Sequence, residues 1–211
     1  AHASKKASPK SSTSAASKTV VRTAGRQRRP LTLRSSLPGG EWVFAKAYGG
    51  SATADQLLLE VIGSTSRALL AKGQIDRWFF IRYADPGEHL RWRLQVSAGT
   101  SPGTVRRQVE RALAAAVERQ LAWRVAFDTY EREVERYGGP EAVLLAERWF
   151  HADSDAVVDI LRELDAAGGT DDRWMATLLS IDRLLDDLGL EPEAKARAMR
   201  EARERFGLEF K

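Results

Sequence analysis

The segment spanning residues 78–96 constrains the fold of this chain more than any other part of the sequence. Residues 78–83 form a strongly apolar, aromatic run, and residues 89–96 alternate strictly between polar and apolar side chains. Between them lies Asp85-Pro86-Gly87, which has the chemistry of a turn because proline presets φ and glycine tolerates positive φ. Two strand-like runs joined by so short a loop predict an antiparallel hairpin.

The rest of the sequence predicts further strands, followed mainly by helices. Strand-like runs occupy 42–48 and 123–129. Apolar residues at helical spacing occupy 53–72, interrupted at Gly63, and 105–117, 140–150, 155–166, 173–188 and 192–205. We expect Ser154 or Asp153 to be the N-cap of the helix at 155–166, and His151 to lie on the surface. With strands mainly N-terminal and helices mainly C-terminal, the predicted class is α+β, an antiparallel sheet packed by helices.

Charge is distributed unevenly along the chain, whose formal net charge is +4. Residues 1–36 hold nine Lys and Arg and no carboxylate, so by subtraction residues 37–211 hold 24 basic and 29 acidic side chains, a net charge of −5. The N-terminal segment has too few apolar residues to offset the entropy of ordering it. We therefore predict a disordered basic linker or extension at 1–36 and one folded domain at 37–211. Weak, sequence-independent RNA contact and a targeting role are the alternatives for the basic segment.

Composition excludes several kinds of chemistry. The absence of cysteine rules out disulfides, thiolate metal sites and a cysteine nucleophile. Three histidines argue against a histidine-rich metal site, and no nucleotide-binding, serine-hydrolase or zinc-protease motif is present. No apolar run reaches the roughly 18 residues needed to cross a bilayer. We expect a soluble cytoplasmic protein with no bound metal or cofactor.

The most informative polar residues lie in the alternating run. Side chains two apart on a strand share a face, so His89, Arg91 and Arg93 project together while the intervening apolar residues face the other side. The planar fork of arginine matches carboxylates and keeps its charge, so two arginines one pleat apart can bind an acidic group. The alternative is a solvated strand face whose arginines pair with carboxylates of a neighbouring strand.

A second cluster of charged residues occupies 130–140. Arg136 and Tyr137 lie beside Gly138-Gly139, which precedes a predicted helix. Backbone N–H groups at a helix start and a nearby arginine can jointly face an anion. The alternative is a charged, solvated turn before an ordinary helix. From these residues alone, the sequence indicates a cationic site for a carboxylate on an α+β domain and names no reaction.

Three long segments in the same order resemble a known family. They are LPGGEWVFAKAYGG at 37–50, WFFIRYADPGEHLRWR at 78–93 and YEREVERYGGPEAVLLAERWFHADS at 130–154. Together they are similar to the C-terminal domain of lantibiotic dehydratases, which also occurs as stand-alone thiopeptide-type bacteriocin biosynthesis proteins. The resemblance spans roughly residues 37–211.

The resemblance implies glutamate elimination. In that family, a Ser or Thr of a ribosomal precursor peptide is glutamylated from glutamyl-tRNA by another domain or protein, and loss of glutamate leaves dehydroalanine or dehydrobutyrine. By motif position, Arg91, Arg93 and Arg136 correspond to the catalytic arginines around the glutamyl group. Arg82, His89 and Tyr137 stand in the same motifs and are the expected substrate-binding residues. The implied partners are the precursor peptide and the glutamylating domain or protein.

The sequence departs from the family pattern in one respect. The elimination domains also use a histidine in a C-terminal HMxxNR-like segment, and neither His89 nor His151 stands at that place. We therefore expect the domain to be truncated at its C-terminus. The alternatives are a thiopeptide pyridine synthase, which joins two dehydroalanines in a [4+2] cycloaddition and expels the leader peptide, or a non-catalytic module that binds the precursor.

Overall fold

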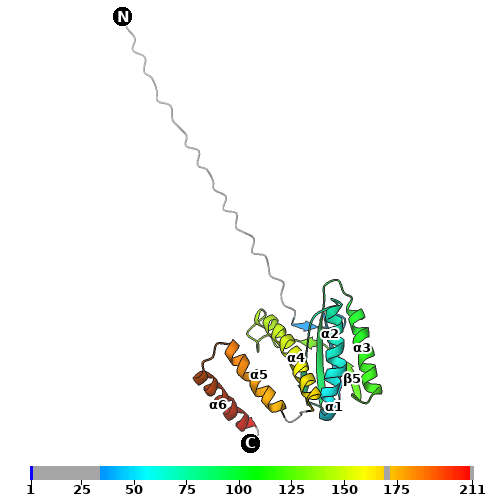
Figure 1. Ribbon diagram of the computed structural model, residues 1–211. Helices are drawn as coiled ribbons and strands as arrows, with labels where there is room; N and C mark the ends of the chain where they lie inside the picture. Colours follow the sequence, from blue (N-terminus) through cyan, green and yellow to red (C-terminus); the bar gives the residue numbers. More distant parts are fainter. Residues whose placement is uncertain (2–33, 169–171, 210–211) are drawn as a thin grey trace. The chain divides into compact units, whose positions relative to one another are not determined.

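A four-stranded antiparallel sheet in the order β3-β4-β2-β5 forms the centre of the folded domain (Figure 1). The computed structural model describes residues 1, 34–168 and 172–209. The strands are β2 (Trp42–Tyr48), β3 (Ile75–Tyr83), β4 (His89–Val96) and β5 (Arg124–Phe127). The predicted hairpin is confirmed, with Tyr83 opposite His89 in the register of β3 and β4. The predicted α+β class is also confirmed.

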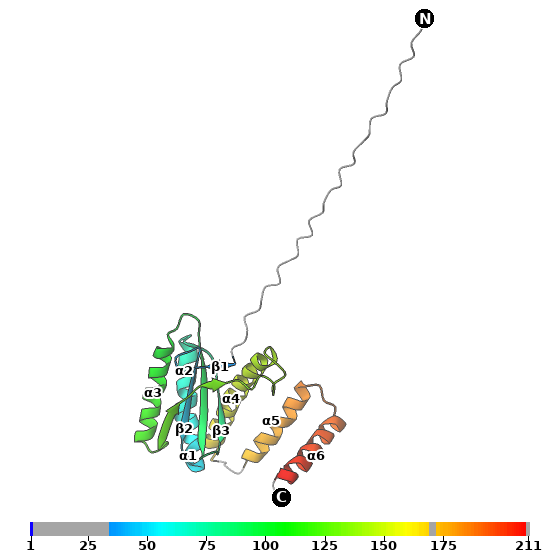
Figure 2. The ribbon, with the colours of Figure 1, turned by 180° about the vertical axis from the view of Figure 1, so that it is seen from behind.

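Helices cover one face of this sheet and enclose the larger core. They are α1 (Ser51–Gln56), η1 (Leu57–Gly63), α2 (Ser64–Ala71) and α3 (Pro102–Glu118), and Figures 1 and 2 show them beside the sheet. The expected interruption at Gly63 is a π-helical turn within one continuous helical segment. A Cβ on Gly63 would lie 3.1 Å from Val158 Cγ1 of α4 (Ala142–Ala166). Glycine therefore permits the close approach of α4 at this point.

The long helix α4 packs along the edge strand β3, where the sequence predicted two helices. The expected N-cap at Ser154 is wrong because its hydroxyl accepts a hydrogen bond from the Phe80 amide of β3, 3.2 Å away. His151 is half-buried rather than a freely solvated surface residue, and its Nδ1 lies 3.0 Å from the Trp78 carbonyl oxygen. Two side chains of α4 thus satisfy outward-facing backbone groups of the edge strand.

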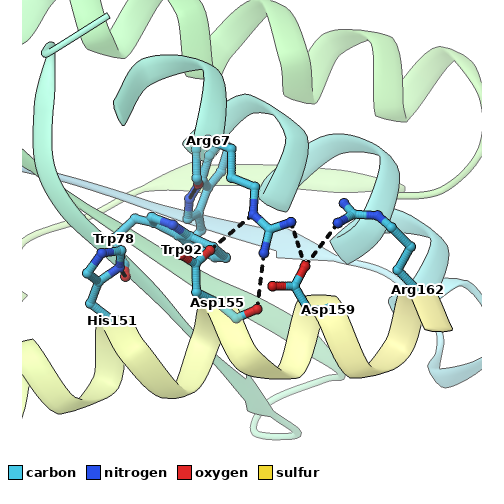
Figure 3. A network of polar contacts seen from close by, with 8 residues as sticks. Arg67, Trp78, Trp92, His151, Asp155, Asp159 and Arg162 are labelled. Atoms are coloured by element: carbon cyan, nitrogen blue, oxygen red, sulfur yellow. Dashed lines mark hydrogen bonds and ion pairs between the residues drawn. The ribbon is translucent and has the colours of Figure 1, made fainter. Parts of the chain in front are cut away.

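An ion-pair network holds the C-terminal half of α4 against α2 (Figure 3). The guanidinium of Arg67 donates to Asp155 Oδ1 at 3.1 Å and lies 2.7 Å from Asp159 Oδ1. Arg162 approaches the same Asp159 oxygen at 3.1 Å. These partly exposed pairs fix the orientation of α4, while burial of Val158 and Leu161 supplies the apolar contact with the main core.

Replacing Ser154 with alanine is expected to lower the free energy of unfolding by about 1–3 kcal/mol, because the Phe80 amide loses its acceptor. Ser154 is 1% exposed, so water cannot readily replace the hydroxyl. Urea unfolding followed by circular dichroism measures the loss. Ser180→Ala is the matched control, since Ser180 is exposed and bonds only its own helix at Ala176 O. Equal losses in the two variants would contradict the assigned role.

A smaller aromatic cluster lies on the other face of the sheet. It consists of Trp42, Phe44, Phe79 and Tyr130, with Phe150 of α4 packed against it. A two-stranded sheet adjoins it, in which β1 (Ser35–Ser36) pairs with β6 (Tyr130–Glu131). The last residues of the predicted linker therefore form a strand, and residues 2–33 lie outside the described residues.

The helices α5 (Arg173–Asp187) and α6 (Pro192–Glu209) follow α4, close to their predicted positions. The apolar stripe of α5 remains largely accessible, with Trp174 60% exposed. Arg173 at its start pairs with Asp55 of α1. In the described part of the chain, no helix has the length and apolar character that a membrane crossing requires.

Candidate functional site

Strand alternation brings basic side chains together on the sheet face opposite α1–α3. There Phe44 of β2 and Phe79 of β3 stand on either side of Arg93 of β4, and Lys46 stands beside Arg91. These side chains line a cleft of about 400 Å³, which we call the arginine cleft. Its lining consists of Phe44, Lys46, Arg91, Arg93, Asp128, Thr129, Glu131 and Glu133.

Arg93 occupies an aromatic box at the base of this cleft and is only 7% exposed. Its Cζ lies 4.5 Å from the ring centroid of Phe44, 4.9 Å from that of Tyr130 and 5.3 Å from that of Phe79. The electron-rich ring faces stabilise the cation without neutralising it. Within the described residues, its buried Nε and Nη1 atoms have no hydrogen-bond partner.

A second buried arginine, Arg132, differs from Arg93 because a carboxylate pairs with it. Arg132 is 4% exposed, and its Nε donates to Glu147 Oε1 at 2.6 Å. Burial opposes its charge, but the bonds to Glu147 more than offset that effect and raise the pKa of Arg132. Arg93 has no such carboxylate, so desolvation by burial lowers its pKa to about 10. It is still charged at neutral pH, with donors available to an incoming anion.

Contacts with Tyr83 and His89 hold the Arg91 side chain in place. Its guanidinium carbon lies 3.4 Å from the centroid of the Tyr83 ring, and its Nε donates to His89 Nε2 at 3.2 Å. Because arginine can only donate, Nε2 must accept, and Nδ1 then donates to the Gly87 carbonyl oxygen 2.7 Å away. His89, 4% exposed, is therefore a neutral support for Arg91.

Lys46 differs from Arg91 in its pairing. Its ammonium lies 2.5 Å from Asp128 Oδ2, and this hydrogen bond lowers the pKa of Asp128. No carboxylate forms an ion pair with Arg91 in the described part of the chain. Among the described residues, the arginine cleft therefore contains two cations, Arg91 and Arg93, that no ion pair balances.

The turn before α4 brings the second predicted cluster to the same cleft. Arg136 is exposed and pairs with Glu133 at 2.8 Å, which raises its pKa, and Glu133 also lines the cleft. Tyr137 packs edge-on against Phe150, with ring centroids 5.3 Å apart. The charge of Glu133 also acts on Arg93 and favours its protonated form. Arg136 pairs with this residue of the lining and Tyr137 follows Arg136 in the chain, so both lie at the rim and not in the lining itself, while Arg93 forms the base.

Arg82 is the predicted site residue that the structure places elsewhere. It stands opposite Leu90 in the register of β3 and β4, on the sheet face that the helices cover. There it forms an ion pair with Asp55, which Arg173 also contacts. The other predicted residues, Arg91, Arg93, Arg136, His89 and Tyr137, lie in the cleft, under it or at its rim.

Sequence reasoning missed the residues that support Arg93. Tyr130 donates its hydroxyl to Glu147 Oε1 at 2.9 Å, and Glu147 is fully buried. Burial first, and then the nearby Glu147 charge, raise the pKa of Tyr130, so its hydroxyl stays protonated as the donor. Alternation along 42–48 could have placed Phe44 and Lys46 on one face. Among the described residues, no cluster of three or more His, Cys, Asp or Glu is arranged to bind a metal ion.

Comparison with solved structures agrees with this architecture. The tRNA-dependent lantibiotic dehydratase MibB from Microbispora sp. 107891 superposes with a TM-score of 0.54 at 30% identity, covering 59% of this chain and 12% of MibB. TsrL superposes with a TM-score of 0.50 at 19% identity, covering 72% of this chain and 40% of TsrL. The likeness to TsrL concerns the fold alone.

Sequence comparison gives two characterised relatives. The nisin biosynthesis protein NisB of Lactococcus lactis subsp. lactis is 28% identical over 136 residues, or 64% of this chain and 13% of NisB. The subtilin biosynthesis protein SpaB of Bacillus subtilis is 28% identical over 157 residues, or 74% of this chain and 15% of SpaB. The chain therefore spans about one seventh of the length of these relatives.

The match to a defined family covers more of the chain than these pairwise matches do. Residues 42–211 match the family described as lantibiotic biosynthesis dehydratase C-term. This range includes all the strands of the central sheet, the arginine cleft and the helices α1–α6. The chain belongs to the lantibiotic dehydratase C-terminal domain family.

Proposed function

We propose that this domain eliminates glutamate from glutamylated Ser or Thr residues of a ribosomal precursor peptide, leaving dehydroalanine or dehydrobutyrine. One observation supports this most strongly. Arg93 is buried in an aromatic box, and its Nε and Nη1 donors have no partner in the described chain. A buried cation without a partner destabilises a fold, so its presence is best explained by an anion that binds there during function.

The chemistry of the reaction matches a cleft with two unpaired arginines. A general base takes the Cα proton, the electron pair of the Cα–H bond forms the Cα–Cβ double bond, the Cβ–O bond breaks, and glutamate leaves as a carboxylate. One carboxylate of the glutamyl group is ionised from the start, and the second acquires its charge as the Cβ–O bond breaks. We assign Arg93 to the first carboxylate and Arg91 to the developing one, because interactions that strengthen with developing charge lower the barrier.

The remaining predicted residues have supporting roles in this proposal. Arg136 and Tyr137 at the rim contact the peptide as it enters the cleft. His89 orients Arg91 and is not assigned proton transfer, because both of its ring nitrogens already form hydrogen bonds. The proposed partners are the precursor peptide and a domain or protein that glutamylates it from glutamyl-tRNA, in the cytoplasm.

Incubation of the chain with a synthetic precursor peptide that contains one glutamyl-Ser ester tests the proposal directly. We expect mass spectrometry to show loss of glutamate and formation of dehydroalanine, detected by thiol addition. The same peptide with unmodified Ser is the control and should not change mass. Cyclisation of a multiply dehydrated peptide with leader release would instead establish a pyridine synthase, and tight binding without any mass change would establish a binding module.

A further inference from the structure

A second cavity lies at the end of the sheet where the loop after β2 meets the β3–β4 turn, and it reaches from the side of α1 to the side chains of Tyr83 and His89. Its volume is about 210 Å³. We call it the apolar pocket, and its walls include Ala47, Gly50, Ala54, Leu57, Tyr83 and His89, together with the charged residues Arg82 and Glu88. Small side chains create the space: a Cβ built on Gly50 would have no atom within 4 Å.

The apolar pocket and the arginine cleft share a wall that is one side chain thick. Tyr83 and His89 line the pocket, and both contact Arg91, which lines the cleft. The Tyr83 ring centroid is 3.4 Å from the Arg91 guanidinium carbon, and His89 Nε2 is 3.2 Å from Arg91 Nε. Only the side chains of Tyr83 and His89 therefore separate a molecule bound at Arg91 from the pocket.

The size and lining of the pocket restrict its occupant. Pockets for drug-sized ligands are roughly 300–1,000 Å³, so this one is too small for such a ligand and suits a single apolar side chain. Neighbouring residues of an extended peptide are spaced by about 3.3 Å, and next neighbours by about 7 Å. A peptide whose modified residue lies at Arg91 and Arg93 can thus place a nearby side chain in the pocket.

We propose that the apolar pocket binds an aliphatic side chain of the precursor peptide, one or two residues from the glutamylated Ser or Thr. The inference rests on the proposed glutamate elimination and adds a determinant of substrate selection to it. Burial of a leucine-sized side chain in such a pocket changes kcat/KM by about 10- to 100-fold. Glutamylated sites with glycine at the same position should react correspondingly more slowly.

Competing peptides that differ only in flanking residues test this inference. Each peptide contains one glutamyl-Ser. Leucine or glycine stands at one of the four positions that lie one or two residues before or after it. The wild-type chain should prefer leucine at one of these positions by about 10-fold or more. Equal rates for every leucine and glycine pair would overturn the inference while leaving the elimination activity established. Glutamate retained on every peptide would show that the proposed function itself fails.

Filling the pocket supplies the second arm of the test. Ala54→Leu places a larger side chain in the pocket from α1, so the preference for leucine should disappear while the glycine peptide reacts at the wild-type rate. Ala52→Leu is the matched control on the exposed side of the same helix and should keep the preference. Ala54→Val should give an intermediate preference for the leucine peptide. This smaller substitution keeps the test valid if the Ala54→Leu variant does not fold. Full preference in both Ala54 variants would overturn the inference.

Discussion

Replacing Arg93 with methionine is expected to abolish glutamate elimination and, at the same time, to raise the free energy of unfolding by about 1–3 kcal/mol. Removing the guanidinium takes away the charge that holds the ionised glutamyl carboxylate, and losing one partner of a buried charge pair costs about 2–5 kcal/mol, so elimination should fall by about 10²-fold or more. Stability should rise because an apolar side chain of similar length replaces buried donors that have no hydrogen-bond partner among the residues the structure describes. Mass spectrometry of the glutamylated peptide and urea unfolding measure the two effects.

The two effects together separate a functional arginine from a structural one. If Arg93 served only the fold, its loss would lower stability, and activity would fall because the domain unfolds. Arg106→Met is a suitable control, because Arg106 also stacks on a ring, Phe127 at 4.9 Å, but pairs with Glu110 and lies on α3, away from the cleft. It should change neither elimination nor stability appreciably. An Arg93→Met variant that is both active and less stable would contradict the assignment.

Replacing Glu147 with alanine is expected to lower the free energy of unfolding by about 3–5 kcal/mol, the cost of removing one partner from a buried ion pair. Glu147 is fully buried and accepts hydrogen bonds from Tyr130 at 2.9 Å and from Arg132 at 2.6 Å. Its removal leaves both donors without this acceptor inside the domain. Urea unfolding monitored by tryptophan fluorescence measures the change.

Two further variants make this prediction specific. Glu163→Ala lies on the same helix but on its exposed side, so its effect should stay within about 0.5 kcal/mol. Tyr130→Phe retains the ring beneath Arg93 and removes only the hydroxyl, so it should cost about 1 kcal/mol. Similar small losses for Glu147→Ala and Glu163→Ala would show that the buried network does not stabilise the domain.

The parts of this molecule that were predictable from sequence are those set by local alternation. The hairpin and the common face of Arg91 and Arg93 follow from the strict period of residues 89–96. The position of Arg82 was obscured because residues 78–83 are apolar on both faces, which hides the alternation that places Arg82 with Trp78 and Phe80.

Other features depend on partners that are distant in the chain. Ser154 has the chemistry of an N-cap, but its hydroxyl bonds Phe80, 74 residues away, and the helix runs through it. Nor could spacing show that Arg93 forms no ion pair within the described part of the chain, since Glu131 and Glu133 occur in the same motif as Arg136. Which of these carboxylates approaches which arginine is decided by the path of the turn before α4.

The coverage of β3 by α4 also limits how this protein can associate through its sheet. Ser154 and His151 bond outward-facing backbone groups of β3, whereas β5 at the opposite edge has no neighbouring strand beyond it in the described part of the chain. An approaching strand would have to displace Ser154 and His151 from these groups before it could pair with β3. The contact with α4 thus protects this edge of the central sheet against strand addition.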